Sequence, residues 1–343
     1  MIKYISLFSG CGGGDIGFHG DFSFLSNYYC KLPFELVYAN EIDLKVARIF
    51  DENFDLKCDK RDIRNVQEGE IPDHDLLIGG FPCQSFSIVA QNPKRLGYKD
   101  EKGMLFFELC RILWAKKPLA FIAENVRGIM SANKGEAFPL ILKEFEECGY
   151  DIKHMVLNAA DYGVPQKRQR VFIIGTRRGY LQNSMARPLP THGPDDGQGQ
   201  LLTDPHLPLG SVVNIRQRVD DKYYFSEKAV AGMKRAKKEM NKGRAQDLNK
   251  PCNTVGAHLA KVSLNGTDPV LKVGEKYRRF TPREVAGIQS FPESFRLVDS
   301  ERAQYIALGN AIPPVLAWHV AKTFAETVMR YDLSDAKHCS APS

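Results

Sequence analysis

The sequence predicts an α/β protein built on a parallel β-sheet, because short apolar runs alternate with amphipathic stretches along its amino-terminal half. Runs with the length and composition of buried strands lie at 2–8, 35–40, 75–78, 119–123 and 171–175. Amphipathic periodicity predicts helices at 103–113 and 136–148. Open α/β sheets bind ligands beyond the carboxyl ends of their strands, so we expect functional residues directly after these apolar runs.

Size and composition narrow the class of protein. The 343 residues, 43% of them hydrophobic, suffice for a full core and a second, smaller domain. No apolar run reaches the roughly 18 residues needed to cross a bilayer, and residues 1–8 are too short for a signal peptide, so we expect a cytoplasmic protein that does not use a membrane. The eight cysteines form no C-x-x-C pair, which argues against a zinc site, and we expect no metal.

The charges are distributed unevenly along the chain. Residues 151–283 hold 24 Lys or Arg against 12 Asp or Glu, whereas the remainder holds 23 against 29. The basic run 234–238 and the group Lys276, Arg278, Arg279 and Arg283 would suit phosphate contacts, although each alone could be a solvated helix face. The asymmetry across this long segment favours a nucleic-acid partner.

The stretch 79–87 is the centre of the predicted site. It follows the apolar run 75–78, two glycines end the strand, and Pro82 precedes Cys83, whose thiol is expected to face the ligand crevice. A cysteine at such a place can also be a small hydrophobe of the core. Residues 91–102 are polar and without periodicity, and we interpret them as a mobile lid.

Other strand ends also carry candidate residues. The glycine-rich loop 9–15 follows the first run and is either a plain tight turn or a site for a nucleoside derivative, since it lacks the G-x-G-x-x-G spacing of pyrophosphate sites. Glu41 is placed to accept hydrogen bonds from ribose hydroxyls, or is a solvated carboxylate. Asp59 and Asp62 lie where a third strand should end, and Glu124 is a candidate acid, a helix cap or a salt-bridge partner.

The chain resembles the bacterial DNA cytosine-5 methyltransferases in seven blocks that come in that family's order. They are FSGCGG at 8–13, GFPCQ at 80–84, GMLF at 103–106, ENV at 124–126, QKRQR at 166–170, RFTPRE at 279–284 and LGNAIPP at 308–314. The resemblance implies a class I methyltransferase fold, a Rossmann-like doubly wound sheet that uses S-adenosyl-L-methionine and yields S-adenosyl-L-homocysteine. It also implies a small target-recognition domain across a DNA-binding cleft, with a last block near 305–321 that returns to the glycine loop.

The resemblance also assigns catalytic roles. The Cys83 thiolate would add to carbon 6 of a flipped cytosine, Glu124 would hold or protonate ring N3, and Arg170 would bind O2. Arg168 would help to keep Cys83 ionised, since cations lower the pKa of a thiol. The base that removes the carbon-5 proton is not evident from the sequence.

Binding residues are carried over from the same family pattern. The residues expected around the cofactor are Phe8, Ser9, Gly10, Cys11, Gly12, Gly13, Glu41, Ile42, Asp62, Ile63, Pro82, Leu105, Asn310 and Ala311. The residues expected on DNA are Gln84, Ser85, Ser87, Lys102, Thr254 and Arg279. The chain departs from the pattern at Lys102, where arginine is usual, and at Lys60-Arg61, where a glycine usually precedes the aspartate.

We expect four segments: a catalytic and cofactor-binding domain at 1–180, a target-recognition domain at 181–278, a return segment at 279–331 and a flexible tail at 332–343. The expected activity is sequence-specific methylation of double-stranded DNA by a nucleoid-associated monomer, beside a cognate restriction endonuclease. Two alternatives remain open: a tRNA cytosine-5 methyltransferase, although the Cys-Phe-Thr block of those enzymes is absent, and a catalytically silent DNA-binding module.

Overall fold

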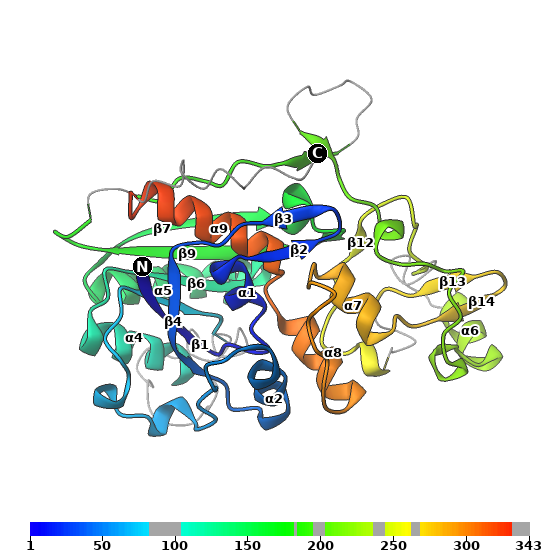
Figure 1. Ribbon diagram of the computed structural model, residues 1–343, viewed down its shortest axis with the longest axis horizontal. Helices are drawn as coiled ribbons and strands as arrows, with labels where there is room; N and C mark the ends of the chain where they lie inside the picture. Colours follow the sequence, from blue (N-terminus) through cyan, green and yellow to red (C-terminus); the bar gives the residue numbers. More distant parts are fainter. Residues whose placement is uncertain (82–103, 182–183, 195–202, 236–243, 262–267, 331–343) are drawn as a thin grey trace.

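A six-stranded sheet with the order β4-β1-β5-β6-β9-β7 forms the centre of the protein (Figure 1). The computed structural model describes residues 1–81, 104–181, 184–194, 203–235, 244–261 and 268–330. The strands are β1 (Ile2–Leu7), β4 (Phe34–Asn40), β5 (Leu76–Gly79), β6 (Ala120–Val126), β7 (Tyr150–Asn158) and β9 (Gln169–Arg177). The α/β class and the central sheet expected from the sequence are confirmed.

The sheet is doubly wound. β1 pairs in parallel with β4 on one side and with β5 on the other, and β5 pairs in parallel with β6. β9 runs antiparallel to both β6 and β7 and is the reversed strand of the sheet. The connections leave β1 and β5 in opposite directions, so the carboxyl ends of these two strands border the crevice in which such folds bind ligands.

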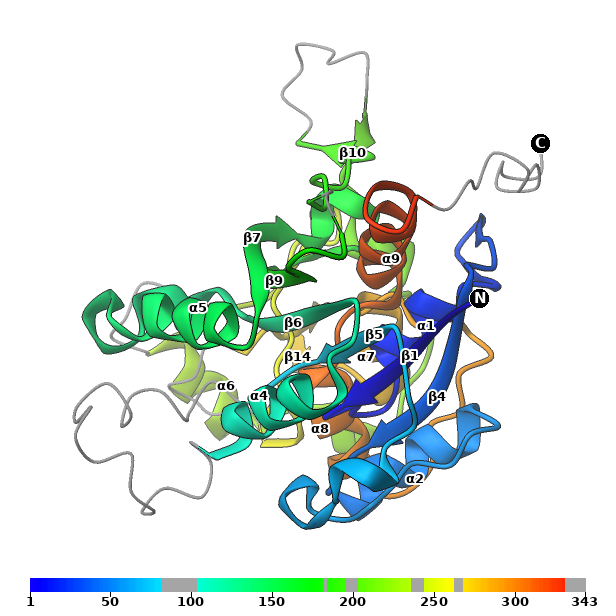
Figure 2. The ribbon, with the colours of Figure 1, turned by 90° about the vertical axis from the view of Figure 1, so that its left-hand side faces the viewer.

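Alternation along the strands builds the two faces of the sheet. Tyr4 and Ile122 belong to a core that includes helices α1 (Gly13–His19) and α9 (Pro314–Thr327). Ile5 and Phe121, one position away, belong to the core with α4 (Met104–Lys116) and α5 (Ala137–Glu147). Figure 2 shows these two helix pairs on opposite sides of the sheet. The parity of a strand residue therefore decides whether it faces α1 and α9 or α4 and α5.

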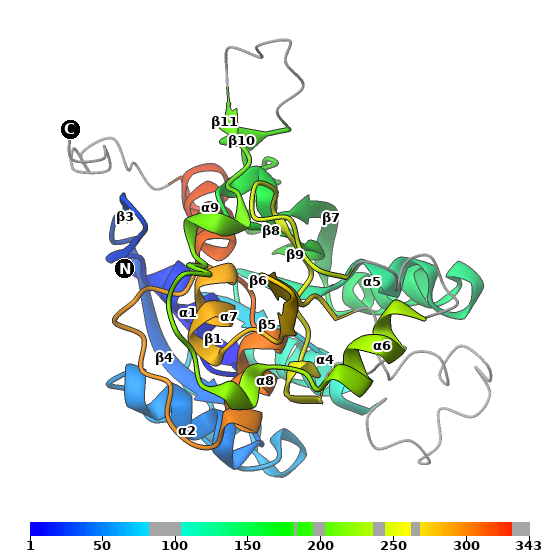
Figure 3. The ribbon, with the colours of Figure 1, turned by 90° about the vertical axis from the view of Figure 1, so that its right-hand side faces the viewer.

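A further core joins the middle of the chain to its amino-terminal part. Leu209, Val255 and Phe280 pack in one cluster with Cys11 and with Val46 of α2 (Leu44–Asn53). Figure 3 faces this side of the protein. The other helices and strands on this side of the protein are β8 (Gln166–Lys167), α6 (Glu227–Lys234), β12 (Cys252–Asn253), β13 (Leu271–Val273), β14 (Lys276–Arg278), α7 (Pro282–Ile288) and α8 (Glu301–Asn310).

The first part of the segment predicted as the recognition domain packs on the sheet layer instead. Met185 is fully buried in the core that contains α9, and the carbonyl of Pro188 accepts a hydrogen bond of 2.9 Å from the Tyr162 hydroxyl. Beyond it the short strands β10 (His192–Gly193) and β11 (Asp204–Pro205) pair with each other. The predicted tail at 332–343 lies outside the described residues.

Two local predictions differ from the structure, and one hairpin lies where the sequence analysis expects no element. A hairpin of β2 (Phe22–Phe24) and β3 (Asn27–Tyr29) was not predicted. The third strand expected before Asp62 is only a single bridge between Asn40 and Asp59, because the chain turns away after it. Glu124 lies inside β6 and not after it, because the pairing with β9 continues to Val126.

One basic group expected on phosphate is largely committed to the fold. Arg278 is 1% exposed and its guanidinium forms two bonds of 2.6 and 2.7 Å to Glu284, so the expectation that it contacts phosphate is wrong. The Arg283 guanidinium donates to the carbonyl of Phe295. Residues 236–238 of the other basic run lie outside the described residues. Within the described parts of the chain, no helix is both long and apolar enough to span a bilayer.

Candidate active site

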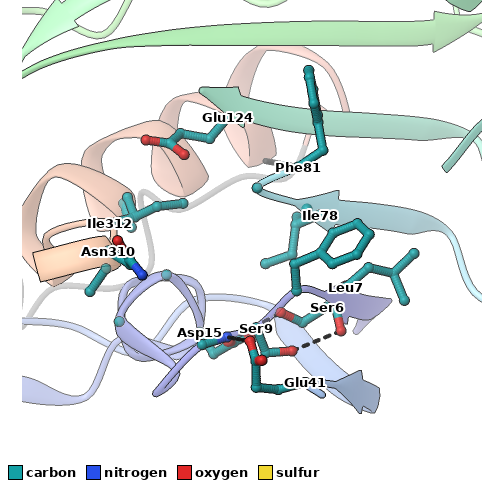
Figure 4. A pocket seen from close by; sticks show the side chains of 18 of the residues that line it. Ser6, Leu7, Ser9, Asp15, Glu41, Ile78, Phe81, Glu124, Asn310 and Ile312 are labelled. Atoms are coloured by element: carbon teal, nitrogen blue, oxygen red, sulfur yellow. Dashed lines mark hydrogen bonds between the residues drawn. The ribbon is translucent and has the colours of Figure 1, made fainter. Parts of the chain in front are cut away.

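A pocket of about 570 Å³ opens at the carboxyl ends of β1, β5 and β6. Its size is typical of sites for small molecules and cofactors. Figure 4 shows its labelled side chains, with Glu124 and Phe81 on one side, Asn310 and Ile312 on another, and Ser9, Asp15 and Glu41 on a third. The residues thus come from both ends of the chain, and the sheet and the 309–312 segment enclose the pocket together.

The glycine loop forms the edge of the pocket next to β1. Phe8 has φ 55° and Gly10 has φ 59°, so the chain turns sharply as soon as the strand ends. A positive φ is uncommon for a non-glycine residue and often marks a functional turn. The added Cβ of an alanine at Gly13 would lie 2.5 Å from the carbonyl oxygen of Ile312. Only glycine lets the start of α1 approach the 309–312 segment so closely.

Glu41 lies at the end of β4 with its carboxylate held by the backbone. One oxygen accepts the N–H of Gly10 at 3.1 Å and the other accepts the N–H of Asp43 at 2.8 Å. Burial raises the pKa of Glu41, and these two backbone donors oppose that shift. The arrangement fixes the carboxylate beside the glycine loop, where it can accept hydroxyl groups of a ligand.

Glu124 and Arg170 form an ion pair on the sheet face that borders the pocket. In the antiparallel pairing, Glu124 is opposite Phe172 and Arg170 is opposite Val126, which makes the two residues diagonal neighbours. Glu124 Oε1 lies 2.9 Å from Nε of Arg170. Burial raises the pKa of Glu124 although Arg170 and Arg168 lower it, and burial lowers the pKa of Arg170. The pair offers a ligand both a carboxyl group and a guanidinium group.

The chain leaves the pocket toward Cys83 directly beside Glu124. An alanine Cβ at Gly80 would lie 3.4 Å from Glu124 Oε2. The carbonyl of Phe81 accepts a hydrogen bond of 2.8 Å from the buried side chain of Asn125. Cys83 itself lies outside the described residues, but it is attached two residues after this anchored point. Its role therefore stays a prediction.

Arg168 does not line the pocket. It is fully buried, and its guanidinium donates to the carbonyls of Val255 at 2.9 Å, Gly309 at 2.8 Å and Ala311 at 2.9 Å. These bonds tie the loop around Val255 to the segment that borders the pocket. Burial and the neighbouring Arg170 lower the pKa of Arg168. Its predicted action on the Cys83 thiol stays untested.

Gly309 permits the same junction, and we expect Gly309→Ala to destabilise it. The added Cβ would lie 2.3 Å from the backbone N of Ala257 and 2.3 Å from the backbone carbon of Gly256, neither of which can rotate away. Overpacking of this kind costs about 1–3 kcal/mol. Thermal unfolding should show a lower melting temperature than the control Gly69→Ala, whose Cβ meets open space. Equal melting temperatures would contradict the tight junction.

The structure brings many of the predicted binding residues together, but not all. The pocket is lined by Phe8, Ser9, Gly10, Gly13, Glu41, Ile42, Leu105, Asn310 and Ala311. Four predicted residues are not among the lining residues. Cys11 and Gly12 are buried within the glycine loop, Ile63 is buried in the core with α4, and Asp62 pairs with Arg64 at 2.5 Å. Pro82, Gln84, Ser85, Ser87 and Lys102 lie outside the described residues.

The two remaining predicted DNA contacts lie away from the pocket lining. The Thr254 hydroxyl donates to the carbonyl of Lys167 at 2.7 Å, next to the 166–170 block. The Arg279 guanidinium lies 5.3 Å from the ring centroid of Tyr223 and donates to the carbonyl of Ala260. Both positions stay predictions as DNA contacts.

Some pocket residues were missed by sequence reasoning. Ser6, Asp15, Asn125, Phe172 and Ile312 all line the pocket. Ser6 could have been found from the sequence, because it is a polar residue near the end of the first strand, and strand alternation places it on the same sheet face as Tyr4. Asp15 had a weaker signal, since it is the last residue of the glycine loop.

The lining fits a nucleoside-type cofactor with an amino-acid end. Glu41 presents a carboxylate, Phe8 an aromatic ring and the glycine loop an open backbone, while Asp15 has a buried oxygen that no described residue bonds. Among the described residues, no group of three or more His, Cys, Asp or Glu side chains is placed to hold a metal ion.

Comparison with known proteins gives a family for this geometry. A family model described as C-5 cytosine-specific DNA methylase matches residues 2–326. Type II methyltransferase M1.ScrFI of Lactococcus lactis subsp. cremoris is 34% identical over 332 residues, which cover 95% of this chain and 78% of the relative. Type II methyltransferase M.Bsp6I of Bacillus sp. (strain RFL6) is 32% identical over 342 residues, which cover 96% of this chain and all 100% of the relative.

Solved structures agree on the fold. The Entamoeba histolytica methyltransferase EhMeth has a TM-score of 0.71 at 17% identity, covering 95% of this chain and 98% of that one. The S. pombe Dnmt2 methyltransferase has a TM-score of 0.70 at 19% identity, covering 94% and 98%. The family and the fold imply S-adenosyl-L-methionine as methyl donor. The resemblance seen in the seven sequence blocks is thereby confirmed, and this chain belongs to the C-5 cytosine-specific DNA methylases as a DNA cytosine-5 methyltransferase.

Proposed function

We propose that the enzyme methylates a cytosine rotated out of duplex DNA, through a transient bond between the Cys83 sulfur and carbon 6 of the base. The observation that carries this proposal is the Glu124–Arg170 pair, 2.9 Å apart on the pocket wall where the chain leaves toward Cys83. Carbon 5 of cytosine is a weak nucleophile, and a covalent bond at carbon 6 raises its electron density. A base stacked in a duplex is out of reach of such groups, which requires rotation at a cost of a few kcal/mol.

Residues of the chain itself transfer the protons and stabilise the charge that develops on the base. The Cys83 thiolate adds to carbon 6 while Glu124 gives a proton to N3, and the Arg170 guanidinium bonds the O2 atom, where electron density builds. S-adenosyl-L-methionine provides an electrophilic methyl group for carbon 5. Loss of the carbon-5 proton to a base then expels Cys83 as thiolate, and N3 returns its proton to Glu124. The raised pKa of Glu124 supports its part as proton donor.

Phe8, Glu41 and Asn310 would hold the cofactor, since each lines the same pocket as Glu124. Of the site residues outside the described parts of the chain, Pro82 is proposed to contact the cofactor. Gln84, Ser85, Ser87 and Lys102 are proposed to contact DNA, in a segment that closes behind the flipped base. Thr254 and Arg279 are proposed as further contacts to DNA, on the side of the molecule that includes β13 and β14.

We also propose that the enzyme acts as a monomer on one short duplex sequence, beside a restriction endonuclease of the same specificity. The support for action at one sequence beside an endonuclease is the Type II methyltransferase description of both relatives, at 34% and 32% identity over nearly the whole chain. Bisulfite sequencing of DNA from cells that express the protein should show methylated cytosines at one recurring site. Methylation scattered over unrelated sequences would contradict this specificity.

A trapping experiment tests the covalent mechanism. Duplex DNA with 5-fluorocytosine at the identified site should form an adduct with the full-length protein that survives denaturation, because fluorine at carbon 5 cannot leave as a proton. Formation of the adduct should require S-adenosyl-L-methionine. When the cofactor carries a tritiated methyl group, duplex DNA should take up the label and tRNA should not. Methyl transfer without any trapped adduct would overturn the proposed role of Cys83.

A further inference from the structure

Asp15 is a buried carboxylate in the pocket to which the proposed mechanism gives no task. It lies in the first turn of α1 and is 1% exposed. Its Oδ2 accepts a hydrogen bond of 3.2 Å from the Ser6 hydroxyl. Its Oδ1 is buried and no hydrogen bond to it is formed among the described residues, although the Tyr4 hydroxyl lies near enough to lower the pKa of the carboxyl group. A buried carboxylate oxygen without a donor is costly, which points to a donor that arrives with a ligand.

The other charged groups of the pocket are already engaged. Among the described residues that line it, Glu124 is paired with Arg170 at 2.9 Å. Each oxygen of Glu41 accepts a backbone N–H, and Asp43 caps α2. Four carboxylates against one guanidinium give this lining a negative balance, which suits a ligand with net positive charge. Of these four carboxylates among the described residues, Asp15 is the one with a fully buried oxygen that accepts no hydrogen bond.

We propose that Asp15 binds the cofactor, with Oδ1 accepting a hydrogen bond from the ammonium group of S-adenosyl-L-methionine and its charge favouring the cationic donor over the product. The inference rests on the cofactor of the proposed function. The donor carries a sulfonium, an ammonium and a carboxylate and is a net cation, whereas S-adenosyl-L-homocysteine has a neutral sulfur. An anionic pocket therefore holds the donor more tightly and helps to release the product.

The pH dependence of binding follows from the surroundings of Asp15. Burial raises the pKa of Asp15 to about 7, opposed by the hydroxyls of Ser6 and Tyr4. The other titratable groups near it among the described residues are Tyr4 on β1, whose pKa burial and Asp15 raise, Cys11 in the glycine loop and Cys58. The lining residue from α9, Ala317, carries no charge. Because only the ionised carboxylate pairs with a cation, donor affinity rises with pH from 6 to 8, and binding below about 7 releases a proton.

Calorimetry on the full-length protein tests the inference without relying on turnover. We expect Asp15→Asn to weaken S-adenosyl-L-methionine binding by about tenfold or more, as the loss of a charge-assisted hydrogen bond requires. Binding of S-adenosyl-L-homocysteine should weaken by less, and the rise of donor affinity with pH should vanish. Asp73→Asn is the matched control, since Asp73 is exposed before β5 and pairs only with Lys116 among the described residues.

A second variant covers the possibility of a folding defect. Ser6→Ala removes the donor to Oδ2, so the pKa of Asp15 should rise further and the affinity curve should move to higher pH. Both ligands carry the ammonium group, so unchanged affinity for both in Asp15→Asn would overturn the proposed bond. Equal weakening of both would overturn the preference for the cationic donor, and an unmoved curve in Ser6→Ala would overturn the pH dependence; each of these results leaves the proposed function standing. If the unaltered protein bound neither ligand, the cofactor assignment of the proposed function would fall, and this inference with it.

Discussion

Cys83→Ser is expected to abolish methyl transfer to duplex DNA while cofactor and DNA binding persist. A serine hydroxyl has nearly the shape of the thiol but stays protonated near neutral pH, so it does not add to carbon 6. Removal of an enzyme nucleophile lowers turnover by about 10⁴-fold or more. Transfer of tritiated methyl to DNA gives the rate, and filter binding gives the affinity for DNA.

Cys58→Ser is the matched control for this loss. Cys58 is a buried free thiol that donates to the carbonyl of Asp59 at 3.7 Å, and it is not among the described lining residues of the pocket. A serine can keep that hydrogen bond, so this variant should retain turnover. If Cys83→Ser kept a rate within tenfold of the unaltered enzyme, a different residue would have to supply the nucleophile.

The sequence predicts which residues follow the strands better than it predicts which residues on neighbouring strands contact them. Glu41 and Glu124 were expected at the carboxyl edge of the sheet because each closes an apolar run, and both line the pocket. That Glu124 meets Arg170 depends on the antiparallel pairing of β6 with β9. Such a pairing joins distant parts of the chain and leaves no local pattern, so only the family resemblance indicated it.

The misses also have physical causes. The β2–β3 hairpin is too short to be stable by itself, and its Tyr29 packs at 5.2 Å from the ring of Trp318 in α9. Arg278 was interpreted as a phosphate contact because charge does not reveal burial, whereas its partner Glu284 lies in the capping box of α7. Asp15 belongs to the predicted glycine-rich loop 9–15, but the sequence gives no sign that its carboxylate is buried. Its burial arises only when α1 packs on β1.

Glu124→Gln is expected to lower methyl transfer by about 10²–10⁴-fold, the range associated with a lost general acid and a lost charge-stabilising contact. The amide keeps the shape and can still accept from Arg170, but it has no proton to give to N3. Formation of the adduct on 5-fluorocytosine DNA should slow by the same factor, because that step needs the proton. Cofactor affinity measured by calorimetry should change much less.

The pH profile separates this role from a structural one. Burial raises the pKa of Glu124, so the protonated form persists to higher pH than for an ordinary carboxyl group, and the rate of the unaltered enzyme should fall as pH rises through that pKa. The variant should lose this alkaline limb. Glu144→Gln is the control, since burial also raises the pKa of Glu144 but the residue lies on α5 outside the described pocket lining. A Glu124→Gln enzyme that kept the limb would show that another group delivers the proton, and Glu124 would then act only by holding Arg170 against the base.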